Sequence, residues 1–120
     1  RQTLIREMIG KLGYPKALIA VEKELSQLPR HDAAQIPKRR ADIIVYAKTK
    51  EGSLAPALLI ECKAVPIAAK FAQQVIGYNT FVGATYVAIA NQMQVLTGCF
   101  DIERGIYSFK PGLPRFDDLF

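Results

Sequence analysis

The sequence predicts a single α/β domain over residues 1–120, with a mixed central sheet flanked by helices in the order α-β-β-β-α-β followed by a short β-hairpin. Three observations predict this class: an amphipathic first segment, two apolar β-branched runs joined by a polar turn, and a helical stripe that lies between two apolar runs. A chain of 120 residues is long enough for one hydrophobic core but short for two domains.

The first segment predicts a helix over residues 1–12, which ends before Gly13 and Pro15 because these residue types stop helices. Its apolar residues follow helical spacing: Leu4, Ile5, Met8, Ile9 and Leu12. Residues 19–25 alternate apolar and polar side chains, which predicts a strand. Residues 26–38 carry two prolines among polar residues, and we expect a loop there.

An antiparallel hairpin is expected next. The β-branched run 43–47 is typical of a strand covered on both faces, and the apolar run 57–64 is its expected partner. A polar turn with Gly52 joins them, as in a hairpin.

A helical crossover is expected after the hairpin. Val65 and Pro66 should open a helix that runs to about residue 82, since proline suits the first helical turn. Its predicted buried stripe consists of Ile67, Phe71, Val75, Tyr78 and Val82. Gly83 ends the helix, and residues 84–90 are expected as a strand parallel to the one before the helix. The remainder predicts a hairpin that turns near residues 103–105.

The charge distribution suggests a polyanionic partner. The net charge is +5, and the only run of three basic residues, Lys38, Arg39 and Arg40, precedes Asp42. This run is the candidate surface for the phosphate backbone of a nucleic acid, although basic runs are also typical of solvated surfaces. No apolar run reaches the roughly 18 residues that span a bilayer, so we expect a cytoplasmic protein without a membrane partner.

The cysteines and the histidine argue against two kinds of chemistry. Cys62 and Cys99 have no metal-ligand spacing, and we expect both to be reduced. His31 is the only histidine and stands in the expected polar loop, which disfavours a catalytic triad.

Two charged residues, Glu61 and Lys63, interrupt the apolar run 57–64. A buried charge is costly unless it is compensated, so the strand is either a solvated edge, the carrier of a simple salt bridge, or part of a site. Because strand side chains alternate, Glu61 and Lys63 share one face and Cys62 points to the other. Asp42 begins the neighbouring strand, within expected reach of Glu61.

A divalent cation would suit these residues. Two carboxylates about 4 Å apart repel by roughly 4 kcal/mol at an effective dielectric near 20, and a cation removes this cost. Mg²⁺ is expected, with Mn²⁺ as a substitute, because it prefers oxygen ligands and keeps much of its shell for water and phosphate. The expected protein ligands are Asp42, Glu61 and the backbone carbonyl of Cys62. Lys63 would orient an attacking water or balance the negative charge that develops.

Three stretches, RRADIIVY, LLIECKA and QQVIGYN, resemble the N-terminal nuclease domain of type I restriction enzyme R (motor) subunits, within the PD-(D/E)xK nuclease superfamily. The resemblance extends to about residue 91 and implies a restriction-endonuclease-like fold. It implies that Asp42 is the aspartate of the motif and that Glu61 and Lys63 are its E-x-K. Gln74 and Tyr78 would be the Q-x-x-x-Y helix motif of the related RecB-like nucleases.

The resemblance also implies magnesium-dependent endonucleolytic cleavage of DNA, with restriction-modification subunits or a motor domain as partners. Ala41 stands where the superfamily name has proline. Many relatives carry an acidic residue in the first helix; Glu7 is the only acid there, and it lies off the apolar stripe. Glu22 is the alternative, although its position also fits a solvent-facing strand residue.

Two other functions stay open. The chain is alternatively a catalytically inactive or partner-dependent nuclease-fold module that binds DNA, or an enzyme that uses Lys63 as a Schiff-base nucleophile. It has no phosphate-binding glycine loop of the ATPase type, so we do not expect it to translocate DNA by itself.

Overall fold

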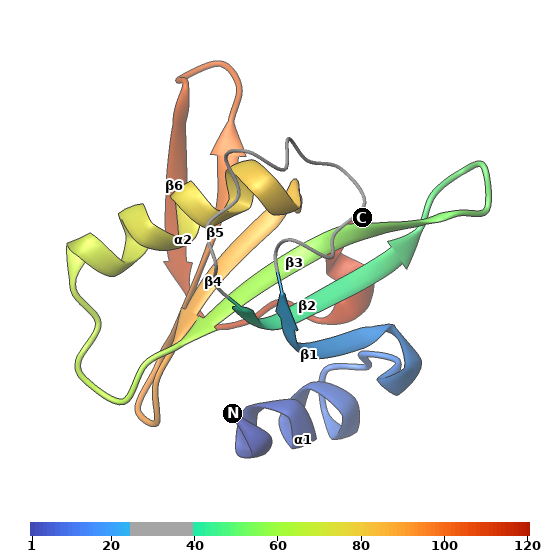
Figure 1. The fold of residues 1–120 in the computed structure, drawn as a ribbon, viewed down its shortest axis with the longest axis horizontal. Coiled ribbons are helices and arrows are strands. Elements are labelled where there is room, and N and C mark those ends of the chain that lie inside the picture. Colours follow the sequence, from blue (N-terminus) through green and yellow to red (C-terminus); the bar gives the residue numbers. More distant parts are fainter. Residues whose placement is uncertain (25–39) are drawn as a thin grey trace.

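The computed structural model describes residues 1–24 and 40–120, in which one six-stranded sheet carries helices on both faces (Figure 1). The strands lie in chain order across the sheet: β1 (Ile19–Glu24), β2 (Arg40–Lys48), β3 (Leu54–Cys62), β4 (Tyr86–Ala90), β5 (Val95–Asp101) and β6 (Ile106–Pro111). Neighbouring strands are antiparallel except for β3 and β4, which are parallel. The predicted α/β class with a mixed sheet is confirmed.

Helix α1 (Gln2–Gly10) ends two residues earlier than the sequence predicts. The backbone N–H groups of Lys11 and Leu12 both donate to the Glu7 carbonyl, at 2.8 and 3.1 Å, so the last turn does not continue. Gly13 has a φ of +77°, a conformation that favours glycine and turns the chain away from the helix axis. A short 3₁₀ turn, η1 (Lys16–Leu18), then leads into β1.

The hairpin of β2 and β3 is confirmed, and both strands begin three residues before the predicted runs 43–47 and 57–64. The predicted end of the second run is wrong, because β3 ends at Cys62 and Lys63 follows the strand. Thr49 and Ser53 close its turn through a 2.7 Å backbone hydrogen bond and a 3.0 Å contact between their hydroxyls. The register shifts between Val45 and Tyr46, where the partner strand contains Pro56 and an additional residue. Because proline has no N–H to donate, this bulge accommodates it within the ladder.

Helix α2 (Ala69–Val82) begins later than the predicted start at Val65 and Pro66. Ala68 has extended backbone angles at the N-cap, and the Val65 carbonyl accepts a 3.2 Å hydrogen bond from Asn91 instead of one from a helical turn. Residues 65–68 thus lie outside the helix, and Val65 contacts the turn between β4 and β5. The predicted end is correct: Gly83 has a φ of +75° and its N–H donates to the Asn79 carbonyl.

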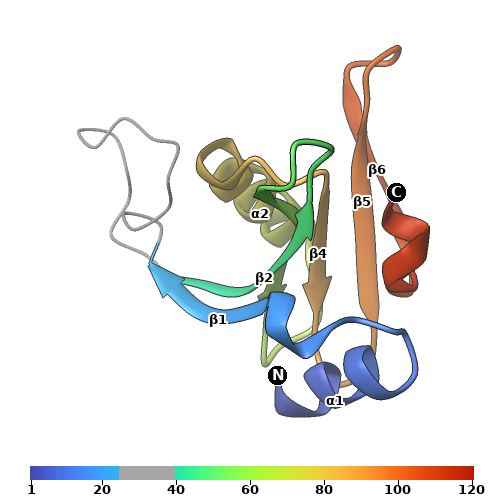
Figure 2. The same cartoon turned by 90° about the vertical axis from the view of Figure 1, so that its right-hand side faces the viewer.

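The sheet is buried on both faces by two hydrophobic clusters. On one face, β2, β3 and β4 pack against α1 and the C-terminal 3₁₀ turn η4 (Phe116–Leu119). On the other face, the same strands pack against α2 through the predicted stripe, of which Val75 and Val82 are the most buried members. Figure 2 shows α2 and η4 on opposite sides of the sheet. A strand in the middle of this arrangement meets protein on both faces.

Several predictions lie outside the described residues. The expected loop 26–38, with His31, and the side chains of Lys38, Arg39 and Arg40 are among them. That residues 1–120 form one domain stays a prediction. In the described part of the chain, no helix has the length and apolar character needed to cross a membrane.

We expect two glycine-to-alanine substitutions to change stability in opposite directions. An added Cβ at Gly98 would lie 2.8 Å from the ring of Phe109, its cross-strand partner, so Gly98→Ala should lower the free energy of unfolding by about 1–3 kcal/mol. At the exposed Gly77 in α2 an added Cβ meets nothing within 4 Å, so Gly77→Ala should raise it by about 0.5–1 kcal/mol. Urea unfolding measures both; equal effects would contradict the predicted close approach of the ring.

Candidate active site

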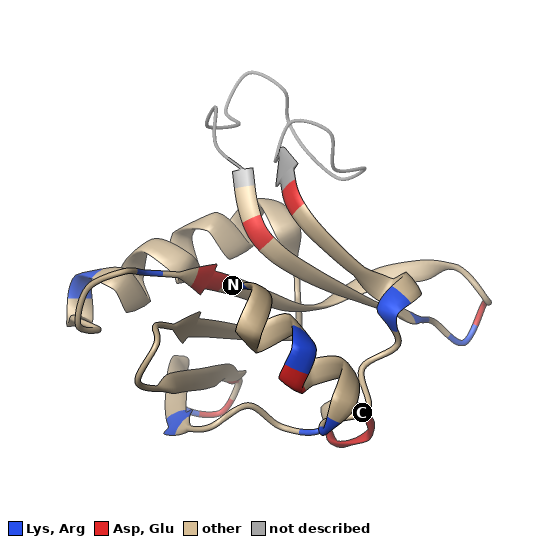
Figure 3. Cartoon of the chain, turned by 90° about the horizontal axis from the view of Figure 1, so that it is seen from below, with Lys and Arg blue, Asp and Glu red and all other residues tan. Residues whose placement is uncertain are grey.

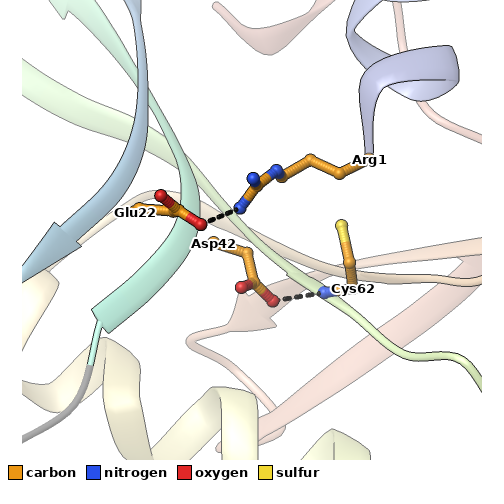
Figure 4. A network of polar contacts seen from close by, with 4 residues as sticks. All are labelled: Arg1, Glu22, Asp42 and Cys62. Carbon is orange, nitrogen blue, oxygen red and sulfur yellow. Dashed lines mark hydrogen bonds and ion pairs between the residues drawn. The ribbon is translucent and has the colours of Figure 1, made fainter.

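Asp42 lies at the start of β2 and reaches the end of β3. Ile43 pairs with Ile60 in the antiparallel register, and one further step along both strands sets Asp42 opposite Glu61. Asp42 Oδ2 accepts a 2.8 Å hydrogen bond from the backbone N–H of Cys62 (Figure 4). The pairing of the two strands thus brings together the predicted aspartate and the segment that carries the predicted E-x-K.

Glu61 is buried within the sheet. The residue is 3% exposed, and it pairs in register with Ile89 of β4, a member of the cluster that faces α2. Because β3 lies between β2 and β4, the solvated-edge explanation for the charges in this strand is wrong. A carboxylate at this depth requires compensation from its surroundings.

Lys63 follows the last residue of β3 and points toward α2. Its backbone N–H donates to the Ala90 carbonyl at 2.8 Å, which continues the parallel pairing beyond the strand end. Its ammonium Nζ donates to Gln74 Oε1 at 3.4 Å and lies 4.8 Å from the centre of the Phe71 ring. A cation over an aromatic face is stabilised by about 0.5–1 kcal/mol at exposed sites. The structure therefore brings together the lysine of one predicted motif and the glutamine of the other.

The second residue of the predicted helix motif, Tyr78, lies one turn beyond Gln74 in α2. It is partly buried and packs against the hydrophobic cluster on the α2 face of the sheet. Cys62 packs against the cluster on the opposite face, beside α1. The alternation expected along β3 is thus observed.

Arg1 and Glu22 form an ion pair next to this region. The Arg1 guanidinium contacts Glu22 Oε1 at 2.9 Å, and Figure 4 shows the pair beside Asp42 and Cys62. Glu22 has a φ of +52°, which is strained for a residue with a Cβ. The expectation that Glu22 simply faces solvent is incomplete, since Glu22 also binds the Arg1 guanidinium close to the predicted site.

Acidic residues occur on three adjacent strands: Glu22 on β1, Asp42 on β2 and Glu61 on β3. Figure 3 shows acidic segments on neighbouring strands and basic segments on α1 and after β3. Among the described residues, no group of three or more His, Cys, Asp or Glu is placed so that it could hold a metal ion. A cation here would therefore have to rely on two carboxylates together with backbone oxygen, water or substrate.

A cleft of about 770 Å³ opens beside Cys62 and Lys63. It lies between α1 and the turn that joins β4 to β5. The described residues that line it are Arg1, Thr3, Leu4, Glu7, Cys62, Lys63, Ala64, Ala90, Asn91, Gln92, Met93, Gln94 and Val95. No local pattern predicts that the β4–β5 turn lies beside Lys63, because the position of this turn depends on the parallel pairing of β3 and β4. Glu7, which lies off the apolar stripe of α1, also lines this cleft.

Burial and the neighbouring charges shift the pKa of the Cys62 thiol. Burial raises its pKa above the ordinary range for a thiol, and the negative charge of Asp42 raises the pKa further. A raised pKa means that Cys62 is protonated near neutral pH and is a weak nucleophile. The cysteine at the centre of the predicted motif is therefore not suited to nucleophilic catalysis.

Comparison with known proteins gives one family match. The family model described as "Type I restriction enzyme R protein N terminus" matches residues 1–114. No curated protein and no solved structure matches the chain.

We expect Asp42→Asn to accelerate the alkylation of Cys62 by iodoacetamide at about pH 8 in EDTA. Removing the carboxylate charge lowers the pKa of the thiol and increases the thiolate fraction, while the asparagine oxygen can still accept the Cys62 N–H. Peptide mapping by mass spectrometry measures the rate. Cys99, which is exposed on β5, is the internal control, and Asp117→Asn in η4 is the matched variant. An unchanged Cys62 rate in Asp42→Asn would contradict the coupling.

Proposed function

Since this chain belongs to the family of type I restriction enzyme R protein N termini, we propose that it is a metal-dependent endonuclease domain that hydrolyses phosphodiester bonds in DNA. One observation carries the proposal: the Asp42 carboxylate is hydrogen-bonded to the Cys62 backbone, where it lies next to the buried Glu61. A hydrophobic core does not require two carboxylates and a lysine at the adjoining ends of two central strands.

The donor set fits Mg²⁺, with Mn²⁺ as a substitute. In this proposal the ion is held by Asp42, Glu61 and the backbone carbonyl of Cys62, all of them oxygen donors. Mg²⁺ usually binds one or two carboxylates and keeps water and substrate phosphate in its remaining positions, so a third carboxylate is not needed. When bound, such an ion supplies an acidified water and neutralises charge on the phosphodiester.

The chain's own side chains then have separate roles. The hydrogen bond from the Cys62 N–H holds the Asp42 carboxylate in one orientation, and such bonds to ionised groups are strong. Gln74 and Phe71 hold the Lys63 ammonium where it would balance the negative charge on the phosphate as the bond to the leaving oxygen breaks. Gln74 is thus a positioning residue for Lys63, and Tyr78 fixes the helix that carries it.

The remaining parts of the proposal concern partners. Lys38, Arg39 and Arg40 precede Asp42 in sequence and would contact the phosphate backbone of DNA. Restriction-modification subunits or a motor domain would supply translocation, for which this chain carries no phosphate-binding glycine loop.

We expect Asp42→Asn, Glu61→Gln and Lys63→Ala each to reduce Mg²⁺-dependent nicking of plasmid DNA by about 10²-fold or more, because each removes a charge that acts on the phosphate or the ion. Gel assays of supercoiled plasmid measure the rate. The matched controls are Glu51→Gln and Lys50→Ala, which lie in the exposed turn at the far end of the same hairpin. Cleavage that persists in all three variants, or in EDTA, would refute the proposal.

We expect calorimetric titration to detect one Mn²⁺ site that is lost in Glu61→Gln and retained in Glu51→Gln. This measurement separates the proposed enzyme from the alternative, an inactive nuclease-fold module that binds DNA. Binding of DNA without any Mn²⁺ site would favour the module.

A further inference from the structure

Two lysines, one directly after β3 and one in the first turn of α2, share one aromatic ring. Residues 62–100 contain only two charged side chains, Lys63 and Lys70. The structure brings both to Phe71: the Lys63 Nζ lies 4.8 Å from the centre of the ring, and the Lys70 Nζ lies 5.4 Å from it. Solubility alone does not require the two charges of this long stretch to meet at one ring.

The partners that hold the two ammonium groups are neutral, so they do not offset the positive charge. Lys63 Nζ donates to the amide oxygen of Gln74 at 3.4 Å, and the Phe71 ring carries no net charge. Gln74 follows Lys70 by four residues, so the two side chains are neighbours on one face of the helix. Lys70 and Gln74 are exposed, and Lys63 and Phe71 are partly exposed, so a ligand in solution can reach this group.

The position of Lys70 is unfavourable for the helix itself. Lys70 is the second residue of α2, and the first turn of this helix contains no acidic side chain. The aligned peptide dipoles place partial positive charge at the N-terminus of a helix, so a lysine there lowers the stability of the helix and an acid would raise it. A cation kept where the local preference favours an acid supports a role outside the helix.

The two lysines lie next to the residues of the proposed active site. Lys63 directly follows Cys62, whose N–H donates to Asp42 at 2.8 Å. Lys70 extends the positive charge from Lys63 to the first turn of α2, and Figure 3 shows basic segments after β3 and at the start of this helix. A DNA strand carries a phosphate at every nucleotide, so a strand held at Lys63 presents further phosphates to a cation nearby.

We propose that Lys70 is a second phosphate-binding residue, which holds a neighbouring phosphate of the DNA strand whose reacting phosphate lies beside Lys63. Phe71 and Gln74 set the spacing of the two ammonium groups, since Phe71 contacts both and Gln74 binds one of them. The strand then passes over the first turn of α2. This inference rests on the proposed nuclease function and adds to it the path of the bound strand beyond the site.

Binding of duplex DNA with Ca²⁺ in place of Mg²⁺ tests the inference, and fluorescence anisotropy measures it. Lys70→Gln should weaken binding by roughly fivefold at low salt, about the contribution of one exposed ion pair. The slope of log Kd against log salt should become shallower by about one, because one phosphate contact is lost. Lys63→Gln should change the slope by a similar amount, and the double variant should change it by about two.

A matched variant controls for the loss of net charge. Lys50→Gln removes the same charge from the exposed turn between β2 and β3, and it should leave the salt slope unchanged. Equal slopes in Lys50→Gln and Lys70→Gln would overturn the inference. A double variant with the slope of either single variant would contradict the binding of two separate phosphates.

Two further measurements separate phosphate binding from roles in the chemical step and in folding. In single-turnover nicking with Mg²⁺, Lys70→Gln should raise the protein concentration at half-maximal rate about fivefold and keep the maximal rate. Lys70→Glu should weaken binding more than Lys70→Gln, while its midpoint of urea unfolding should be no lower than that of the wild type, since an acid suits the first turn. A lower midpoint with an unchanged salt slope would assign Lys70 to folding and overturn the inference.

The outcomes also distinguish this inference from the nuclease proposal. DNA cleavage with an unchanged salt slope in Lys70→Gln would overturn the inference and leave the nuclease intact. A slope that changes in Lys70→Gln, without cleavage by the wild-type chain, would support phosphate binding by Lys70 in a module that has no catalytic activity. An absence of DNA binding by the wild-type chain would overturn both.

Discussion

The antiparallel pairing of β2 with β3 is the constraint on which the rest of the site depends. It sets Asp42 across from the end of β3, where the aspartate accepts the Cys62 N–H at 2.8 Å. A shift of one residue in this register would turn Asp42 to the other face of the sheet and separate it from Glu61. The bulge between Val45 and Tyr46 lies several residues away, toward the hairpin turn, so the register near Asp42 is regular.

The parallel step from β3 to β4 provides the second half of the site. The crossover between these parallel strands is helix α2, which covers one face of the sheet while its exposed Gln74 reaches Lys63. The same step places the β4–β5 turn next to Lys63, since the end of β3 and the end of β4 lie side by side. One topological feature therefore brings both a helix and a turn to the lysine.

The sequence predicted the parts of the fold that depend on local patterns and missed those that depend on distant contacts. Periodicity was sufficient for the strands, for the buried stripe of α2 and for its end at Gly83. It placed the start of α2 too early, in a segment where Val65 contacts Asn91 from a distant part of the chain.

The same distinction between local patterns and distant contacts applies to the residues of the candidate site. Strand alternation predicted that Lys63 and Cys62 point to opposite faces, and their contacts with α2 and with the α1-side cluster agree. The Arg1–Glu22 ion pair and the hydrogen bond of Lys63 with Gln74 join segments that are far apart in sequence. Pairs of this kind depend on the final packing, and spacing along the chain carries no signal for them.

The burial of Glu61 argues for a role beyond stability. It is 3% exposed between Ile60 and Cys62, in a strand whose inward positions are otherwise aliphatic. Replacing a buried ionised group and its partners with apolar residues of similar volume is often neutral or stabilising, so stability alone would favour a hydrophobic residue here. Functional sites are where proteins keep groups that a stable core would replace. A carboxyl group kept in the centre of this sheet, one peptide away from the N–H that holds Asp42, therefore supports the proposal that the two acids hold a metal ion together.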